Sequence, residues 1–185
     1  MIAREDVRKS LLSKMCRAAD FPKPGVEYLN VLFTMTRYPG LFADVVSCLA
    51  EEARSRTVTA VVGIESRGFV FAAPVALALG VPFIPVRKKG KLPPPVHSVT
   101  YALEYGTDSL EIAQDAAPQG SRVILVDDIL ATGGTAKAAA DLLERVGHEV
   151  VAIAFVGEIS QLHGRSKLGG HEVISLAEFR PQREV

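Results

Sequence analysis

The segment Val123–Thr135 contains residue types that together can hold a phosphate and a sugar. An apolar run ends in two adjacent carboxylates, and a loop of small residues then opens into a helix. Backbone N–H groups at the start of a helix attract anions, because they are unpaired and the helix dipole adds positive charge. Carboxylates accept hydrogen bonds from sugar hydroxyls or hold a cation. The segment therefore predicts a site for a phosphorylated sugar, formed by Asp127, Asp128, Ala131, Thr132, Gly133, Gly134 and Thr135.

Two other nucleotide-binding motifs are excluded. The stretch Gly63–Gly68 has the glycine spacing of a P-loop, but Phe69 and Val70 stand where that motif needs a lysine and a hydroxyl residue. No G-x-G-x-x-G follows the first predicted strand. The acids and the threonine-glycine loop after one strand thus remain the strongest signal for chemistry in this sequence.

The elements that must position this loop follow an alternating pattern. Short apolar runs predict strands at Thr59–Gly63, Phe83–Val86, Arg122–Val126, Val150–Val156 and Val173–Leu176. Helical spacing predicts helices at Arg4–Ala19, Leu41–Arg54, Phe69–Leu79 and Thr135–Val146. Alternating strands and helices are typical of an α/β fold with an open, mainly parallel sheet flanked by helices. Ligands of such sheets bind at the carboxyl ends of the strands. We expect a single domain over residues 1–185.

One stretch interrupts the alternation. Between Lys88 and Gln119 there are three consecutive prolines, Pro93–Pro95, and a predicted hairpin around Tyr105–Asp108. We expect residues of about 88–118 to leave the sheet and form a hood-like insertion. Long insertions in compact domains often act as lids over active sites.

Composition excludes several classes of protein. The 185 residues are 48% hydrophobic, with 21 basic and 21 acidic side chains, so neither a disordered chain nor a duplex-binding protein is expected. Two cysteines without metal-ligand spacing, and a charged start, predict a cytoplasmic protein. The uncharged stretch Gly68–Val86 contains three prolines, and we expect a buried helix and a buried strand there rather than a membrane span.

The segment Val123–Thr135 closely resembles the phosphoribosyl pyrophosphate motif of type I phosphoribosyltransferases. Other stretches resemble the members of that family that act on adenine, in the same order along the chain: Asp20–Gly25, Gly63–Phe69, Val86–Pro93, Leu103–Gly106 and, more weakly, Glu158–Arg165. The resemblance implies an enzyme of purine salvage that converts adenine and phosphoribosyl pyrophosphate to AMP and pyrophosphate. It also implies Mg²⁺ held mainly by the substrate, no metal site made of side chains, and a homodimer.

The resemblance also implies roles for individual residues. Glu104 is the implied catalytic residue, and Tyr105 helps close the hood. The implied pyrophosphate-binding residues are Ser66, Arg67, Arg87, Lys88 and Lys91. From the sequence, Ser66 is also a candidate cap of the next helix, which is compatible with that role. Val26, Glu27 and Leu162 are the implied base-binding residues, and the segment of about 1–35 is the implied base-binding segment.

The sequence departs from the family near the base. Leu29 and Asn30 stand where the family has an arginine and an aspartate. One alternative is therefore the same reaction on another purine or a base analogue. A second is a regulator that binds phosphoribosyl pyrophosphate without catalysis, but such regulators carry a DNA-binding segment and a basic surface. Neither is visible here, so an enzyme is favoured.

Overall fold

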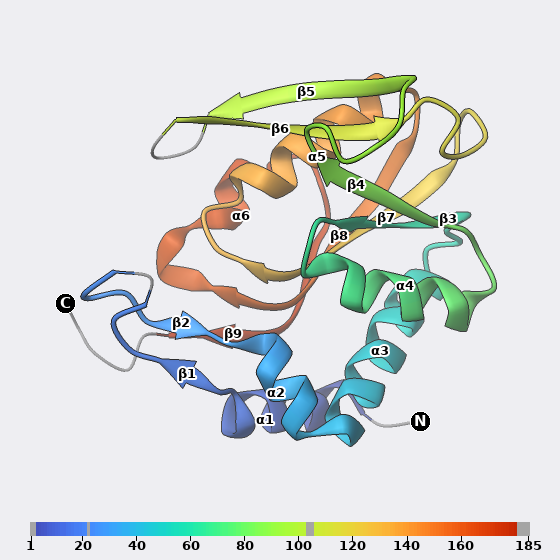
Figure 1. Ribbon diagram of the computed structural model, residues 1–185. Helices are drawn as coiled ribbons and strands as arrows, with labels where there is room; N and C mark the ends of the chain where they lie inside the picture. Colours follow the sequence, from blue (N-terminus) through green and yellow to red (C-terminus); the bar gives the residue numbers. More distant parts are fainter. Residues whose placement is uncertain (1–2, 22, 103–105, 181–185) are drawn as a thin grey trace.

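The computed structural model describes residues 3–21, 23–102 and 106–180. Within them, seven strands form a sheet in the order β5-β6-β4-β3-β7-β8-β9 (Figure 1). The parallel strands are β4 (Phe83–Lys88), β3 (Ala60–Ile64), β7 (Arg122–Leu130), β8 (Glu149–Ile159) and β9 (Val173–Phe179). This open, mainly parallel sheet confirms the predicted fold class.

Helices cover both faces of the sheet. Figure 1 shows α1 (Arg4–Lys14), α2 (Val31–Arg37), α3 (Pro39–Arg54) and α4 (Gly68–Leu79) below the central strands, and α5 (Gly134–Arg145) above β7 and β8. Side chains alternate along a strand, and β7 shows this directly. Ile124 and Val126 pack in the core beneath the sheet, whereas Val123 and Leu125 pack in the core against α5. β7 is thus apolar on both sides, as its sequence predicts.

The first helix is shorter than its sequence pattern predicts. It ends at Lys14 rather than Ala19, and β1 (Arg17–Ala18) then pairs antiparallel with β2 (Tyr28–Leu29). The chain leaves the helix because the Cys16 N–H donates to Thr34 Oγ1 at 2.9 Å, and the Cys16 carbonyl accepts from Asn30 N–H at 2.8 Å. These long-range bonds replace the next turn of helix.

The strand before the predicted sugar-phosphate loop is longer than predicted. β7 continues to Leu130 because it pairs with β8 as far as Glu158. Asp127 and Asp128 therefore lie inside a paired strand, not after its end. Their backbones are fixed by the sheet, which gives the two carboxylates a rigid support.

The prediction that the insertion leaves the sheet is wrong. Strands β5 (Val96–Ala102) and β6 (Thr107–Ala113) form an antiparallel hairpin, and β6 also pairs with β4 at Arg87 and Lys88. Leu110 and Ile112 are fully buried in the core that α5 covers, which explains why the hairpin stays attached. The predicted hairpin itself is confirmed, although residues 103–105 lie outside the described part of the chain.

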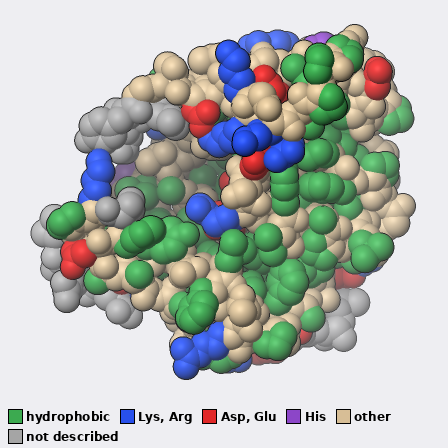
Figure 2. Space-filling model, in the orientation of Figure 1, with side chains coloured by type: hydrophobic (Ala, Val, Ile, Leu, Met, Phe, Trp, Pro, Cys, Tyr) green, Lys and Arg blue, Asp and Glu red, His purple; other side chains and the backbone are tan. Residues whose placement is uncertain are grey.

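The uncharged stretch that begins at Gly68 forms the helix α4 and the strand β4. No helix in the described part of the chain is long and apolar enough to cross a membrane. The expectation of a buried helix holds only for one face of α4, where Phe71 and Val75 are buried. Val70 and Leu77 on the other face are 39% and 83% exposed. Figure 2 shows hydrophobic side chains gathered over this side of the molecule.

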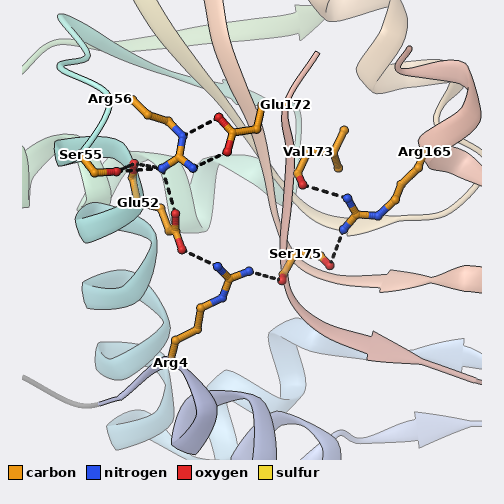
Figure 3. A network of polar contacts seen from close by, with 8 residues as sticks. All are labelled: Arg4, Glu52, Ser55, Arg56, Arg165, Glu172, Val173 and Ser175. Carbon is orange, nitrogen blue, oxygen red and sulfur yellow. Dashed lines mark hydrogen bonds and ion pairs between the residues drawn. The ribbon is translucent and has the colours of Figure 1, made fainter. Parts of the chain in front are cut away.

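A network of polar contacts ties the last strand to the first and third helices (Figure 3). Arg4 donates to the Ser175 carbonyl at 2.9 Å and to Glu52 at 2.6 Å. Arg56 joins Glu52 to Glu172, which directly precedes β9. These bonds fix the edge of the sheet against α1 and α3.

Candidate active site

A cavity of about 370 Å³ lies at the carboxyl ends of β3, β4 and β7. This is the place where open α/β sheets bind ligands. Figure 2 shows Lys and Arg side chains beside a hollow in the middle of this face. Nine of the predicted site residues line the cavity: Ser66, Arg67, Lys88, Asp127, Ala131, Thr132, Gly133, Gly134 and Thr135.

The loop before α5 presents a helix start to the cavity. Residues 131–133 are not helical, Gly133 is the N-cap, and α5 begins at Gly134. Gly133 has a φ of +79°, and a Cβ atom there would lie 2.5 Å from the Gly164 carbonyl oxygen. Only glycine combines this φ with so close an approach. The first-turn N–H groups of a twelve-residue helix therefore lie at the cavity wall, an arrangement that suits an anion.

The two carboxylates have different surroundings. Asp127 lines the cavity, and burial together with the neighbouring Asp128 carboxylate raises the pKa of Asp127 well above its usual range. Asp128 is 1% exposed, and its Oδ2 accepts a hydrogen bond from Arg67 Nε at 2.5 Å. Its Oδ1 is buried without a hydrogen-bond partner among the described residues. The pair therefore offers acceptor atoms that donors such as hydroxyl groups could satisfy.

A third carboxylate, Glu65, holds the basic loop that follows β4. Arg87 donates to both oxygens of Glu65 at 3.1 and 3.2 Å, and the Lys88 N–H donates to Oε2 at 2.9 Å. Burial opposes ionisation of Glu65, but these hydrogen bonds outweigh it and lower the pKa of the carboxyl. Glu111 fixes the far end of the loop, accepting from Gly90 N–H at 2.9 Å. The loop is thus ordered by acids on β6 and at the end of β3.

Comparisons with known proteins place this site in a family. The family model for the phosphoribosyl transferase domain matches residues 35–168, most of the chain and the whole of the cavity wall. The chain belongs to the phosphoribosyltransferase family. The match includes the acids, the loop and the helix start described above.

Individual relatives agree closely with this chain. It is 45% identical over 172 residues to the adenine phosphoribosyltransferase of Chloroflexus aurantiacus, covering 93% of this chain and 99% of the relative. It is 49% identical over 170 residues to that of Clostridium perfringens, covering 92% and 98%. The crystal structure of the Thermoanaerobacter pseudethanolicus enzyme superposes with a TM-score of 0.87 at 42% identity, covering 96% of this chain and all of that one. The Saccharomyces cerevisiae enzyme, complexed with an imino-altritol bisphosphate and adenine, gives 0.86 at 42% identity, covering 93% and 99%.

Among the described residues predicted from resemblance to phosphoribosyltransferases, five do not line the cavity: Val26, Glu27, Arg87, Lys91 and Leu162. Arg87 and Lys91 lie beside it, where Arg87 Nη1 donates to the Lys91 carbonyl at 2.9 Å. Val26 and Leu162 are 43% and 45% exposed. Glu27 accepts from Arg17 at 2.7 Å. Glu104 and Tyr105 lie outside the described residues.

The two positions that depart from the phosphoribosyltransferase pattern have structural roles here. Leu29 is buried in the core beneath the sheet. Asn30 is the N-cap of α2, where its Oδ1 accepts from Phe33 N–H at 3.1 Å. The prediction that Ser66 caps α4 is wrong, because Arg67 is the N-cap of that helix and the cap has no side-chain hydrogen bond.

Some functional neighbours were not predicted. Glu65, Ile129, Leu130, Ala136 and Phe155 also line the cavity. Glu65 stands within the family-like stretch Gly63–Phe69, so the sequence did carry a signal for it. The apolar lining residues carry none, because an Ile or Phe at a strand end is normally part of a core.

Proposed function

We propose that this protein transfers the phosphoribosyl group of phosphoribosyl pyrophosphate to adenine, forming AMP and pyrophosphate in purine salvage. The observation that carries the proposal is the helix start at Gly133 and Gly134, which shares a cavity with the Asp127 carboxylate. One wall suits a phosphate and the other a sugar. Relatives named adenine phosphoribosyltransferase, at 45–49% identity over most of the chain, support adenine as the base.

The groups proposed to bind phosphoribosyl pyrophosphate are held in position by the strand β7 and the start of α5. In this proposal the N–H groups of Ala131–Thr135 and the hydroxyls of Thr132 and Thr135 bind the 5′-phosphate. Asp127 and Asp128 accept hydrogen bonds from the ribose hydroxyls, with Asp128 also holding Arg67. The Asp128 Oδ1 atom supports this, since it is a buried acceptor without a hydrogen-bond partner among the described residues.

The leaving group is the pyrophosphate on C1 of the ribose. As a ring nitrogen of adenine bonds to C1, the C1–oxygen bond breaks and its electron pair leaves with pyrophosphate. Ser66, Arg67, Arg87, Lys88 and Lys91 are assigned to this polyanion, whose charge they stabilise as it departs. Positioned cations are effective because they need no rearrangement during the reaction.

Magnesium belongs to the proposal as a companion of the substrate. No group of three or more His, Cys, Asp or Glu side chains among the described residues could hold a metal ion. Mg²⁺ keeps several waters and favours phosphate oxygens. In this proposal the ion therefore arrives bound to phosphoribosyl pyrophosphate. Such an ion neutralises part of the pyrophosphate charge.

The base side is assigned to the segment of about 1–35. Val26, Glu27 and Leu162 contact adenine in this proposal, and Glu104 takes the proton that the ring nitrogen loses. Tyr105 covers the site with the rest of the insertion. The exposure of Val26 and Leu162 supports this role, since apolar side chains at the surface can contact a flat base.

The direct test is an assay with a panel of bases. The protein is incubated with Mg²⁺, phosphoribosyl pyrophosphate and adenine, hypoxanthine or guanine, and released pyrophosphate and nucleotide are measured. We expect AMP with adenine and much slower release with the other bases. Saturable binding of phosphoribosyl pyrophosphate without release for any base would instead identify a regulator. We place the reaction in the cytoplasm, which agrees with the free thiols of Cys16 and Cys48.

A homodimer is part of the same proposal, with α4 at the interface. Val70 and Leu77 are exposed on a helix that carries no charged residue, and such apolar surfaces favour association. Leu77→Lys should therefore convert the dimer to a monomer of half the mass in size-exclusion chromatography with light scattering. Leu12→Lys, at an exposed leucine of α1, is the matched control and should leave the mass unchanged. A Leu77→Lys variant that stays dimeric would place the interface elsewhere.

A further inference from the structure

Three cations assigned to pyrophosphate are each paired with a carboxylate. Arg67 pairs with Asp128, Arg87 with Glu65, and Lys88 with Asp108. Asp128 lies in the central strand β7, and Glu65, directly after β3, also accepts the Lys88 N–H. Asp108 differs, since it comes from β6 of the insertion and, among the described residues, its one hydrogen-bond partner in the central strands is Lys88.

Lys88 lies at the cavity wall, but its ammonium group already has partners from the insertion. Its Nζ donates to Asp108 Oδ2 and to Tyr101 Oη, the latter at 3.2 Å, and lies 5.8 Å from the centre of the Tyr101 ring. Tyr101 Oη also lies 3.4 Å from Thr135 Oγ1, in the predicted phosphate loop. Lys88 therefore reaches the cavity while its charge is balanced by the insertion.

This balance has an electrostatic consequence. The hydrogen bond from Lys88 lowers the pKa of Asp108, so that carboxyl is ionised at neutral pH. An ammonium has three N–H donors, and two of those of Lys88 are engaged. A pyrophosphate that approaches Lys88 must therefore come close to a carboxylate, which repels it and shares the same cation.

We propose that Asp108 competes with the pyrophosphate group for Lys88 and thereby weakens the hold of the site on its leaving group. The inference rests on the proposed function and adds a positioning residue that acts through Lys88. Its benefit lies after group transfer, because product release limits the turnover of many enzymes. Asp108 recaptures Lys88 as pyrophosphate leaves, and so restores the empty site.

The test measures the Kd of inorganic pyrophosphate with Mg²⁺ by titration calorimetry. Asp108→Asn is nearly isosteric and keeps an oxygen for the Ser109 N–H, which Asp108 Oδ1 accepts at 2.8 Å. Removing one half-exposed carboxylate beside the cation should tighten binding about fivefold. Asp108→Glu keeps the charge and should bind close to the wild-type value. Asp115→Asn removes an exposed charge from the same insertion, with no partner among the described residues, and should have no effect.

A gain in affinity is an informative readout, because damage to the fold cannot produce it. An unchanged or weaker Kd in Asp108→Asn overturns the proposal, as does equal tightening in Asp115→Asn. In steady-state assays Asp108→Asn should lower the KM of phosphoribosyl pyrophosphate and leave the KM of adenine unchanged. Asp108→Ser provides a second charge-removing variant should the first prove unstable on heating. Absence of AMP synthesis in the wild-type protein would refute the proposed function separately.

Discussion

Gly133→Ala should abolish tight binding of phosphoribosyl pyrophosphate and lower the free energy of unfolding. The left-handed backbone of Gly133 costs an alanine about 1–2 kcal/mol. The added Cβ would also lie 2.5 Å from the Gly164 carbonyl oxygen, and Gly164 has little room to move because Ala131 and Leu130 lie close to it. The loop must therefore shift. A shift of about 1 Å in a positioning group costs about 100-fold, and we expect a loss of affinity of this size by calorimetry.

Gly120→Ala is a control that separates the cost of a left-handed backbone from the cost of the close contact with Gly164. Gly120 has a φ of +76°, close to that of Gly133, but a Cβ there meets nothing within 4 Å. We expect this control to lose about 1 kcal/mol of stability in urea unfolding and to bind phosphoribosyl pyrophosphate normally. If Gly133→Ala binds as the wild type does, residues 131–135 do not hold the 5′-phosphate.

Glu104→Ala should lower kcat by ~10²–10⁴-fold, the range that general acid–base catalysis supplies. Its role follows from the resemblance, and the neighbouring strand supports it. Tyr101, three residues earlier in the chain, contacts Lys88 and approaches Thr135, so β5 reaches the cavity. Because the carboxylate acts on the base, the Kd of phosphoribosyl pyrophosphate should stay within about twofold of the wild-type value.

Glu178→Ala is the control for this prediction. Glu178 is an exposed glutamate of β9, two strands from β7 in the sheet, and it does not line the cavity, so its loss should leave kcat unchanged. Rapid-quench measurement of AMP formation separates the chemical step from product release. A Glu104→Ala enzyme with a wild-type rate of AMP formation would assign the proton to another group.

The central strands, their helices and the loop of residues 131–133 before α5 could be predicted from the sequence because the signals are local. The apolar run of β7 and the glycines after it lie within thirteen residues, so periodicity and turn chemistry suffice. The same holds for α4, whose end at Gly80 is marked by a left-handed glycine. The register of neighbouring strands then brings Glu65, Lys88 and Asp127 to one edge.

The contacts that could not be predicted depend on distant partners. Asp108 faces Lys88 only because β6 pairs with β4, a register that no local pattern in the insertion specifies. The first helix stops early because Thr34 and Asn30 bind Cys16 across the intervening turn. Residues beyond Lys14 do keep the helical spacing of apolar side chains, but the long-range hydrogen bonds of Cys16 outweigh that local preference. Local sequence thus predicts helices and strands better than it predicts the distant residues that pair with them or end them.

The attachment of β9 to α1 has a consequence for synthesis on the ribosome. Val7 and Leu11 of α1 pack in one core with Ile174 and Leu176, and Arg17 donates to the Arg180 carbonyl at 3.1 Å. The first helix to emerge must therefore wait for the last strand to be translated. A premature stop codon before Val173 would leave residues 122–135 intact yet strip the amino-terminal segment of its support. In the proposed function this segment binds the base, and adenine binding is then the final capability that the nascent polypeptide acquires.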